Sequence, residues 1–213
     1  MTTMASSSSQ RGTVFIDWDG TITDIAPGNY AAMLAINRLF GRDPPTYGIE
    51  GMKKAISEAG AVSYFRSFLP GSEWTDEGIV EMIIRFRDPK IAPVFSDIHS
   101  SLDRLRTAGF ALHLISRAFA ERLSEEVKLS GLVFDSVCLT TDRAKSENMK
   151  ELIPKSCSPM YYVGDDLADI TEAEKVGVTP LAVSRGNYSA EVLSRRARHF
   201  DTVASAADFI LSR

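Results

Sequence analysis

The stretch Thr13–Thr21, TVFIDWDGT, decides the fold because an apolar strand runs directly into two carboxylates and a glycine turn. Side chains two positions apart in an extended chain project to the same side, so Asp17 and Asp19 can face one pocket beyond the strand. Gly20 lets the chain turn sharply away. One carboxylate can attack while the other transfers protons. This arrangement is typical of phosphoryl transfer, although a short D-x-D-G string also occurs in exposed acidic turns.

The composition indicates one main domain with room for an insertion. The chain has 213 residues, of which 44% are hydrophobic, so it can bury a substantial core. Its formal net charge is -4 and its basic residues are scattered, which argues against a nucleic-acid partner. No apolar stretch approaches the roughly 18 residues that a membrane helix needs, so no membrane partner is expected.

The N-terminus and the cysteines indicate where the protein resides. Residues 1–12 include four consecutive serines and few apolar side chains, so we expect a disordered leader. An organelle transit peptide is the weaker alternative because Arg11 is the single arginine there. Cys138 and Cys157 have no C-x-x-C spacing, which favours reduced, structural thiols. We therefore expect a cytoplasmic protein.

From Ala108 onward, short β-rich runs alternate with amphipathic helical segments. The expected strands are 110–115, 136–139, 160–163 and 180–183, and the expected helices are 119–129, 146–153, 167–176, 190–197 and 204–211. Repeated β-α units predict an α/β fold with a doubly wound parallel sheet and a Rossmann-like core. Ligands bind beyond the carboxyl ends of such strands, which is where Asp17, Ser116 and Asp165 fall.

Residues 25–93 break this pattern and read as an inserted, small helical cap domain. The expected helices there are 30–40, 51–59 and 76–86, separated by Gly and Pro. The remaining residues, 13–24 and 94–213, form the α/β core. Both connections lie at the strand ends, so we expect the insertion to overhang the site. The alternative is that its helices simply pack on the sheet.

Three further positions beyond predicted strands carry polar chemistry. The turn after Ser116 offers its hydroxyl and the following backbone amides to phosphate, although a serine there is also an ordinary helix cap. Lys145 lies at a loop-to-helix boundary and offers an ammonium, with a solvated surface lysine as the alternative. Gly164–Asp169 places three acids at a helix start, which favours Mg²⁺ binding over simple helix-dipole compensation.

Together these motifs resemble the haloacid dehalogenase superfamily over nearly the whole chain. The matching residues are Asp17-x-Asp19-Gly20-Thr21, the strand ending in Ser116, Lys145, and Gly164-Asp165-x-x-x-Asp169. The helical insertion resembles the cap of the phosphoglycolate phosphatase and β-phosphoglucomutase-like group. The order of the motifs along the chain carries the resemblance.

The resemblance implies a role for each matched residue. The implied catalytic residues are Asp17 as nucleophile, Asp19 as acid and then base, and Ser116 and Lys145 as phosphate binders. Gly20 and Arg117 complete the implied phosphate-binding set. The implied Mg²⁺ ligands are Asp17, the backbone carbonyl of Asp19, and Asp165, with Asp169 in an outer position and Asp166 as a further acid.

Two positions depart from the family pattern, and the cap offers further candidates. Ser146 follows the motif lysine where many relatives have proline, and Trp18 replaces a smaller apolar residue, either for packing or to reach the substrate. Lys53 and Lys54 fall near the specificity loop of related caps and are candidate substrate contacts. Lysines on a solvated helix face are the alternative.

The predicted function is Mg²⁺-dependent hydrolysis of a small-molecule phosphomonoester through an aspartyl-phosphate. The expected partner is a small phosphorylated metabolite, and the expected state is a monomer or homodimer. A sugar phosphomutase is the nearest alternative because it uses the same two acids. A dehalogenase needs no acid at position 19, and a catalytically idle binding protein has little reason to keep Asp17, Asp19, Asp165 and Asp169 together.

Overall fold

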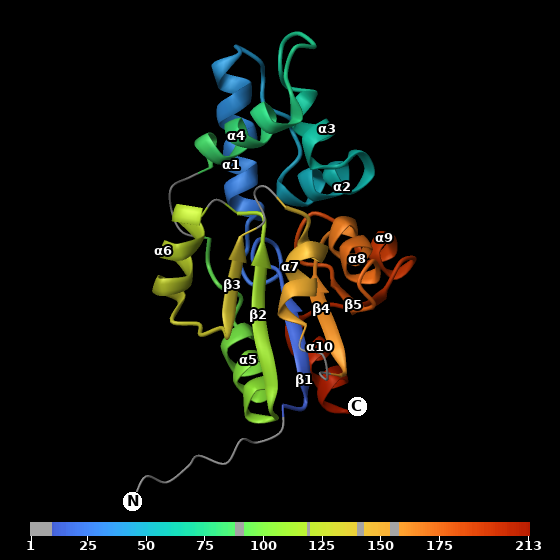
Figure 1. The fold of residues 1–213 in the computed structure, drawn as a ribbon. Helices are drawn as coiled ribbons and strands as arrows, with labels where there is room; N and C mark the ends of the chain where they lie inside the picture. Colours follow the sequence, from blue (N-terminus) through green and yellow to red (C-terminus); the bar gives the residue numbers. More distant parts are fainter. Residues whose placement is uncertain (1–9, 88–91, 119, 140–142, 154–157) are drawn as a thin grey trace, which may run out of the picture.

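A six-stranded, entirely parallel sheet forms the centre of the protein in a computed structural model that describes residues 10–87, 92–118, 120–139, 143–153 and 158–213 (Figure 1). The strands are β1 (Gly12–Ile16), β2 (Phe110–Ser116), β3 (Ser136–Leu139), β4 (Met160–Gly164), β5 (Thr179–Val183) and β6 (Arg198–Phe200). Their spatial order is β3-β2-β1-β4-β5-β6. This is the order of a doubly wound dinucleotide-binding sheet, so the predicted fold class is confirmed.

The helices fall into two groups (Figure 1). Six flank the sheet: α5 (Ile98–Thr107), α6 (Ala120–Ser130), α7 (Lys145–Leu152), α8 (Leu167–Glu174), α9 (Ala190–Ser194) and α10 (Val203–Leu211). Four lie between β1 and α5 in the chain: α1 (Ala26–Leu39), α2 (Ile49–Ala59), α3 (Ala61–Arg66) and α4 (Asp76–Phe86). The second group sits beyond the carboxyl ends of the strands, where the arrowheads point.

Strand β1 shows why the sheet is buried on both faces. Val14 and Ile16 join the cluster that α5 and α10 cover, while Phe15 between them joins the opposite cluster with Met149 of α7 and Ala173 of α8. All three β1 side chains are fully buried. A parallel strand covered by helices on both faces needs this continuous apolar run, which is what the sequence provides.

The helices α1 to α4 bury a hydrophobic cluster of their own. Its buried members include Met33 and Ile36 of α1, Met52 and Ile56 of α2, Phe65 of α3 and Ile79 and Ile83 of α4. The chain leaves and returns at one point, because Thr23 and Val94 form an antiparallel bridge. The Asp24 amide donates to the Pro93 carbonyl (2.9 Å), and the Phe95 amide donates to Ile22 (3.0 Å).

Three local features differ from the sequence predictions. The helix predicted over 190–197 ends at Ser194, and Arg198–Phe200 adds the edge strand β6, which is too short for an alternating pattern to reveal. Helix α3 is a six-residue segment directly after Gly60 that the sequence reading missed. Gly12, assigned to the leader, opens β1.

Other expectations concern the ends and the cysteines. Residues 1–9 and Cys157 lie outside the described part of the chain. Cys138 on β3 is a free, partly buried thiol. Among the described residues, no helix is both long and apolar enough to cross a bilayer.

Truncating the sheet-facing Leu102 of α5 should destabilise the core. Leu102 is 1% exposed within the cluster that β1 and β4 share, so Leu102→Ala should lower the free energy of unfolding by about 2–5 kcal/mol. Denaturant unfolding measures this change. Leu129→Ala is the matched control because Leu129 is 60% exposed, and its effect should stay within about 0.5 kcal/mol. Equal losses in both variants would contradict this account of the core.

Candidate active site

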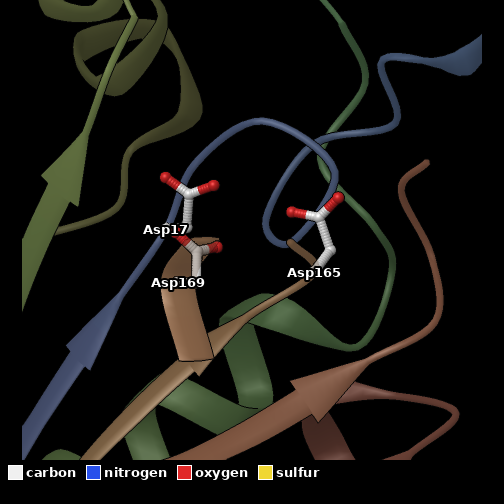
Figure 2. A group of neighbouring side chains, drawn as sticks. All are labelled: Asp17, Asp165 and Asp169. Atoms are coloured by element: carbon white, nitrogen blue, oxygen red, sulfur yellow. The ribbon is translucent and has the colours of Figure 1, made fainter. Parts of the chain in front are cut away.

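Asp17 and Asp165 meet at the switch point of the sheet. Strand β1 pairs with β2 on one side and β4 on the other, so successive crossovers diverge from the gap between β1 and β4. Asp17 follows β1 and Asp165 follows β4. The Asp17 amide donates to the Val163 carbonyl (3.0 Å), which extends the pairing to the acid itself. Ligand atoms of Asp17, Asp165 and Asp169 lie within 4.8 Å of one another (Figure 2).

Lys145 supplies the positive charge that faces these acids. It is the first residue of α7, and its side chain is 4% exposed. Its Nζ donates to Asp17 Oδ1 (2.8 Å), Asp169 Oδ1 (2.6 Å) and the Tyr162 hydroxyl (2.8 Å). All three ammonium protons therefore have acceptors. The lysine is a buried structural member of the cluster and not a solvated surface residue.

The protonation of the cluster reflects an excess of buried negative charge. Burial raises the pKa of Asp17 to about 7, against the opposing effect of Lys145. Burial, followed by repulsion from Asp17 and Asp169, raises the pKa of Asp165 well above 3.8. Burial acts to lower the pKa of Lys145, but the attraction of Asp169 and Asp17 outweighs it and raises that pKa well above 10.5. The acids therefore favour a bound proton or a further cation.

Glycines make room for the Asp165 carboxylate. A Cβ at Gly186 would lie 1.6 Å from Asp165 Oδ2, and one at Gly20, where φ is +80°, would lie 2.4 Å from the same atom. Thr21 Oγ1 donates to Asp165 Oδ1 (3.1 Å). Gly20 adopts a left-handed conformation, which glycine reaches without strain, in the sharp turn predicted there.

The acid cluster fits a hard divalent cation. Its donors are carboxylate oxygens only, which suits Mg²⁺ or Ca²⁺ better than softer metals. Asp169 Oδ2 is buried and has no hydrogen-bond partner among the described residues. A buried carboxylate oxygen without a donor is costly unless a cation approaches it. This acceptor adds to the buried negative charge that a cation bound by the neighbouring acids would offset.

Asp19 lies beside this cluster but has different partners. Arg122 of α6 donates from Nη2 to Asp19 Oδ2 (2.5 Å), and Arg87, directly after α4, donates from Nη1 to the same oxygen (3.4 Å). Asn29 Oδ1 in turn accepts from Arg87 Nε (2.8 Å). Asp19 Oδ1 is buried without a partner among the described residues. Two helices from different parts of the chain thus converge on one carboxylate oxygen.

Trp18, the unusual residue between the two motif acids, points into the sheet core. Its side chain is fully buried, which decides between packing and substrate contact in favour of packing. Its Nε1 donates to Glu126 Oε2 (2.6 Å), and Glu126 Oε1 accepts from Arg122 Nη1 (3.3 Å). Burial raises the pKa of Glu126, while Arg122 and the Trp18 hydrogen bond oppose that rise.

Ser116, Arg117 and Asp166 surround the site in more ordinary local structures. Ser116 is 1% exposed, and its Oγ accepts from the Ala118 amide (3.1 Å), a turn-forming contact. Arg117 Nη2 lies 3.6 Å from Asp166 Oδ2. Asp166 Oδ1 caps α8 by accepting from the Ala168 amide (2.8 Å). The alternative that these acids favour the positive end of a helix therefore describes one oxygen of Asp166.

A cavity of about 180 Å³ joins these residues to the helical segment. Its lining includes Asp17, Asp19, Ser116, Arg117, Arg122, Lys145, Asp165 and Asp166 from the sheet side and Asn29, Ala61, Val62, Phe65, Val80, Ile83, Ile84 and Arg87 from the segment side. Lys53 and Lys54 line a separate cavity, with Tyr188 and Ser189. The structure thus brings the motif acids together and leaves the two lysines apart from them.

Sequence reasoning missed Arg87, Arg122 and Glu126. The one available signal was the spacing of Arg122 and Glu126, which stand four positions apart on a predicted helix. Such pairs are common on solvated helix faces. Only the fold reveals that this pair is turned inward towards Asp19.

The parallel sheet and the acid cluster at its switch point define an α/β protein with its site between the sheet and a helical segment. A family model described as haloacid dehalogenase-like hydrolase matches residues 12–177, and the chain belongs to this family. A comparison with curated protein sequences finds no match.

Several solved structures share the fold. A predicted phosphatase from Clostridium acetobutylicum matches with a TM-score of 0.75 and 20% identity, over 96% of this chain and 100% of that one. Protein Tyrosine Kinase A from Mycobacterium tuberculosis matches with a TM-score of 0.72 and 18% identity, over 97% of this chain and 100% of that one. A predicted phosphoglycolate phosphatase from Haemophilus somnus matches with a TM-score of 0.70 and 15% identity, over 95% of this chain and 99% of that one. At these identities the likeness establishes the fold and leaves the reaction to the site.

Removing the ionisable group of Asp17 should change how stability depends on pH. The pKa of Asp17 in the folded protein is raised, so its stabilising contribution is complete below about pH 4 and is lost as pH rises through about 7. Asparagine cannot ionise. In chelator, the stability of Asp17→Asn relative to wild type should therefore increase between pH 5 and pH 8, by up to about 3 kcal/mol.

Denaturant unfolding at several pH values measures this difference. Asp208→Asn, which removes an exposed carboxylate from α10, controls for a simple change of net charge. A stability difference between Asp17→Asn and wild type that stays constant with pH would show that burial does not raise this pKa.

Proposed function

We propose that the protein is a Mg²⁺-dependent phosphatase that hydrolyses a small phosphomonoester through an aspartyl-phosphate on Asp17. The observation that carries the proposal is the position of Asp17. Its carboxylate lies at the switch point, hydrogen-bonded to Lys145 and within 4.8 Å of the oxygens of Asp165 and Asp169. Membership of a hydrolase family supports the reaction class.

In this proposal, residues 25–93 act as a cap domain and residues 13–24 with 94–213 as the catalytic core. The separate hydrophobic cluster of α1 to α4 supports the division. The shared cavity supports the cap role, because residues of α1, α3 and α4 line it together with the acids. A cap over the site excludes bulk water while the phosphoryl group is attached to the protein.

Asp17 performs the first step. One of its carboxylate oxygens attacks phosphorus, forming an aspartyl O–P bond as the bond from phosphorus to the ester oxygen breaks. Asp19 gives a proton to the departing ester oxygen, so the leaving group departs as a neutral alcohol. Lys145 holds Asp17 in place through the 2.8 Å hydrogen bond.

Asp19 then reverses its role. Its carboxylate takes a proton from a water molecule, whose oxygen attacks phosphorus as the aspartyl O–P bond breaks. Inorganic phosphate and the Asp17 carboxylate are the products. Both steps use the same acid, which must therefore stand close to the ester oxygen and to the attacking water in turn.

The phosphate group is held by donors that line the cavity. The Ser116 hydroxyl, Arg117 and the backbone amides after β2 form this set. Lys145 adds its positive charge beside them, and Gly20 allows close approach of the chain. Asp17, Asp165 and the backbone carbonyl of Asp19 would hold Mg²⁺, and Asp169 would steady Lys145 (2.6 Å) beside it. When bound, the ion neutralises negative charge on the transferring phosphoryl group. The cavity of about 180 Å³ suits a small phosphorylated metabolite.

Phosphate release from a metabolite panel tests the reaction. Wild type with Mg²⁺ should release phosphate, chelator should stop it, and Asp17→Asn should lower kcat by about 10³-fold or more because the nucleophile is gone. Movement of phosphate between positions of a sugar, without release, would identify a phosphomutase instead. No turnover of any substrate would favour a binding protein on the same fold.

Thermal unfolding tests the metal separately from the reaction. Mg²⁺ should raise Tm of the wild type because the ion binds the folded state, with a gain of about 2.7 kcal/mol at 100 times the dissociation constant. Asp165→Asn should abolish that rise, since it removes an acceptor from the cluster. Asp208→Asn should retain the rise, because its carboxylate is exposed on α10. An equal rise in all three proteins would place the ion elsewhere.

A further inference from the structure

Asp19 belongs to a continuous row of polar side chains that the family-wide motifs do not include. The row runs from Trp18 through Glu126 and Arg122 to Asp19. Trp18 Nε1 donates to Glu126 Oε2 (2.6 Å), Arg122 Nη1 donates to Glu126 Oε1 (3.3 Å), and Arg122 Nη2 donates to Asp19 Oδ2 (2.5 Å). The row begins and ends at two consecutive residues, Trp18 and Asp19, so α6 and the loop after β1 brace each other.

Each member of the row is held on two sides. Both carboxylate oxygens of Glu126 are engaged, and its side chain is 5% exposed. The guanidinium of Arg122 is planar, so bonds from its two terminal nitrogens to Glu126 and Asp19 fix its orientation. Trp18 is fully buried in the sheet core, so packing holds its indole in one position. Asp19 Oδ2 is thus connected, through Arg122 and Glu126, to a side chain that core packing holds in place.

The row holds only one oxygen of Asp19. Arg122 and Arg87 both donate to Oδ2, whereas Oδ1 is buried without a partner among the described residues. Asp19 also lines the central cavity, beside Asp17. The contacts to Oδ2 therefore leave Oδ1 without a competing donor among the described residues, on a side chain that lines the cavity.

Arg122, and not Arg87, is the fixed member of the pair. Arg87 follows α4, its contact with Asp19 is longer (3.4 Å), and its other partner, Asn29, belongs to α1. Both anchors of Arg87 outside Asp19 thus lie in the helical segment. Arg122 is anchored by Glu126 and, through it, by Trp18, which belong to the sheet and its covering helix.

We propose that Arg122, braced by Glu126 and Trp18, is a positioning residue that aims Asp19 Oδ1 at the leaving-group oxygen. This inference rests on the proposed function, because it assigns a purpose to contacts of the proposed acid. The competing interpretation is a salt bridge that only stabilises the fold. A buried ion pair does not by itself distinguish a positioning role from a stabilising one, so the experiment must separate the two roles.

Leaving groups of different basicity separate the two roles. Hydrolysis of an alkyl phosphate expels a strongly basic alkoxide and needs the proton of Asp19. Hydrolysis of p-nitrophenyl phosphate expels a weakly basic phenolate and needs that proton far less. A residue that positions Asp19 must affect the first substrate more than the second. A residue that only stabilises the fold has no means of distinguishing them.

The experiment uses the full chain with Mg²⁺ and three variants: Glu126→Gln, Arg122→Lys and Trp18→Phe. Asp19→Asn serves as the reference for complete loss of the acid, and Asp208→Asn, in an exposed ion pair with Arg104, as the matched control. kcat and KM are measured for 2-hydroxyethyl phosphate and for p-nitrophenyl phosphate. Thermal unfolding of each variant verifies that it is folded at the assay temperature.

We expect kcat for the alkyl phosphate to fall about 10- to 100-fold in Glu126→Gln and Arg122→Lys. A general acid typically contributes about 10²- to 10⁴-fold to the rate, and a misplaced Asp19 should lose part of that contribution. KM should change less than about twofold, and kcat for p-nitrophenyl phosphate less than about threefold. Trp18→Phe should show the same selectivity with a smaller loss. Asp208→Asn should match wild type on both substrates.

The failures are distinguishable. A wild type that hydrolyses neither of these substrates nor any phosphomonoester of the metabolite panel overturns the proposed function itself. A wild type that hydrolyses both, with folded variants slowed equally on both, overturns the positioning role and leaves the phosphatase intact. Arg122→Lys keeps the inference testable where Glu126→Gln does not fold, because the Arg122 side chain is 25% exposed and tolerates replacement better than the buried glutamate.

Discussion

Three buried carboxylates gathered beside one ammonium are the constraint on which the rest of this structure depends. Lys145 binds Asp17 and Asp169 directly, Asp165 lies beside them, and burial raises the pKa of both Asp17 and Asp165. Such a cluster opposes folding unless the backbone forces it together. The order of the sheet does so, because β1 and β4 pair directly and end at the same edge. The apolar strands supply the free energy that holds the acids in place.

The sequence predicts the acids well because they follow strands whose direction is fixed. Once β1 and β4 are read as neighbouring parallel strands, Asp17 and Asp165 must lie close together, and the motif spacing adds Lys145. Arg87 and Arg122 escape such reasoning, since their contacts with Asp19 span 68 and 103 residues and depend on how whole helices pack. Periodicity describes which face of a helix is apolar and does not specify which distant carboxylate an arginine meets. Strand β6 was missed for the same reason, because its three residues are defined by pairing with β5.

Trp18 replaces the smaller apolar residue of the family pattern, and its larger side chain determines which residues must lie around it. An indole in the sheet core leaves a buried N–H that needs an acceptor. Glu126 provides the acceptor, and a buried glutamate needs a cation or a proton, which brings in Arg122. Arg122 completes its own contacts at Asp19. A single large side chain between the motif acids is thereby linked to a charged pair on α6, and the three residues form one unit.

The helical segment forms one wall of the cavity beside Asp19. Its helices carry their own hydrophobic cluster, and the chain enters and leaves through adjoining stretches bridged at Thr23 and Val94. The cavity wall that it contributes is mainly apolar, with Arg87 and Asn29 as its polar members. The sheet side contributes almost all the charge. A ligand held there is therefore bound at its charged end by residues of the sheet edge and is surrounded elsewhere by apolar side chains of α3 and α4. In the proposed function, the uncharged part of a substrate contacts that wall, whereas Lys53 and Lys54 line a separate cavity.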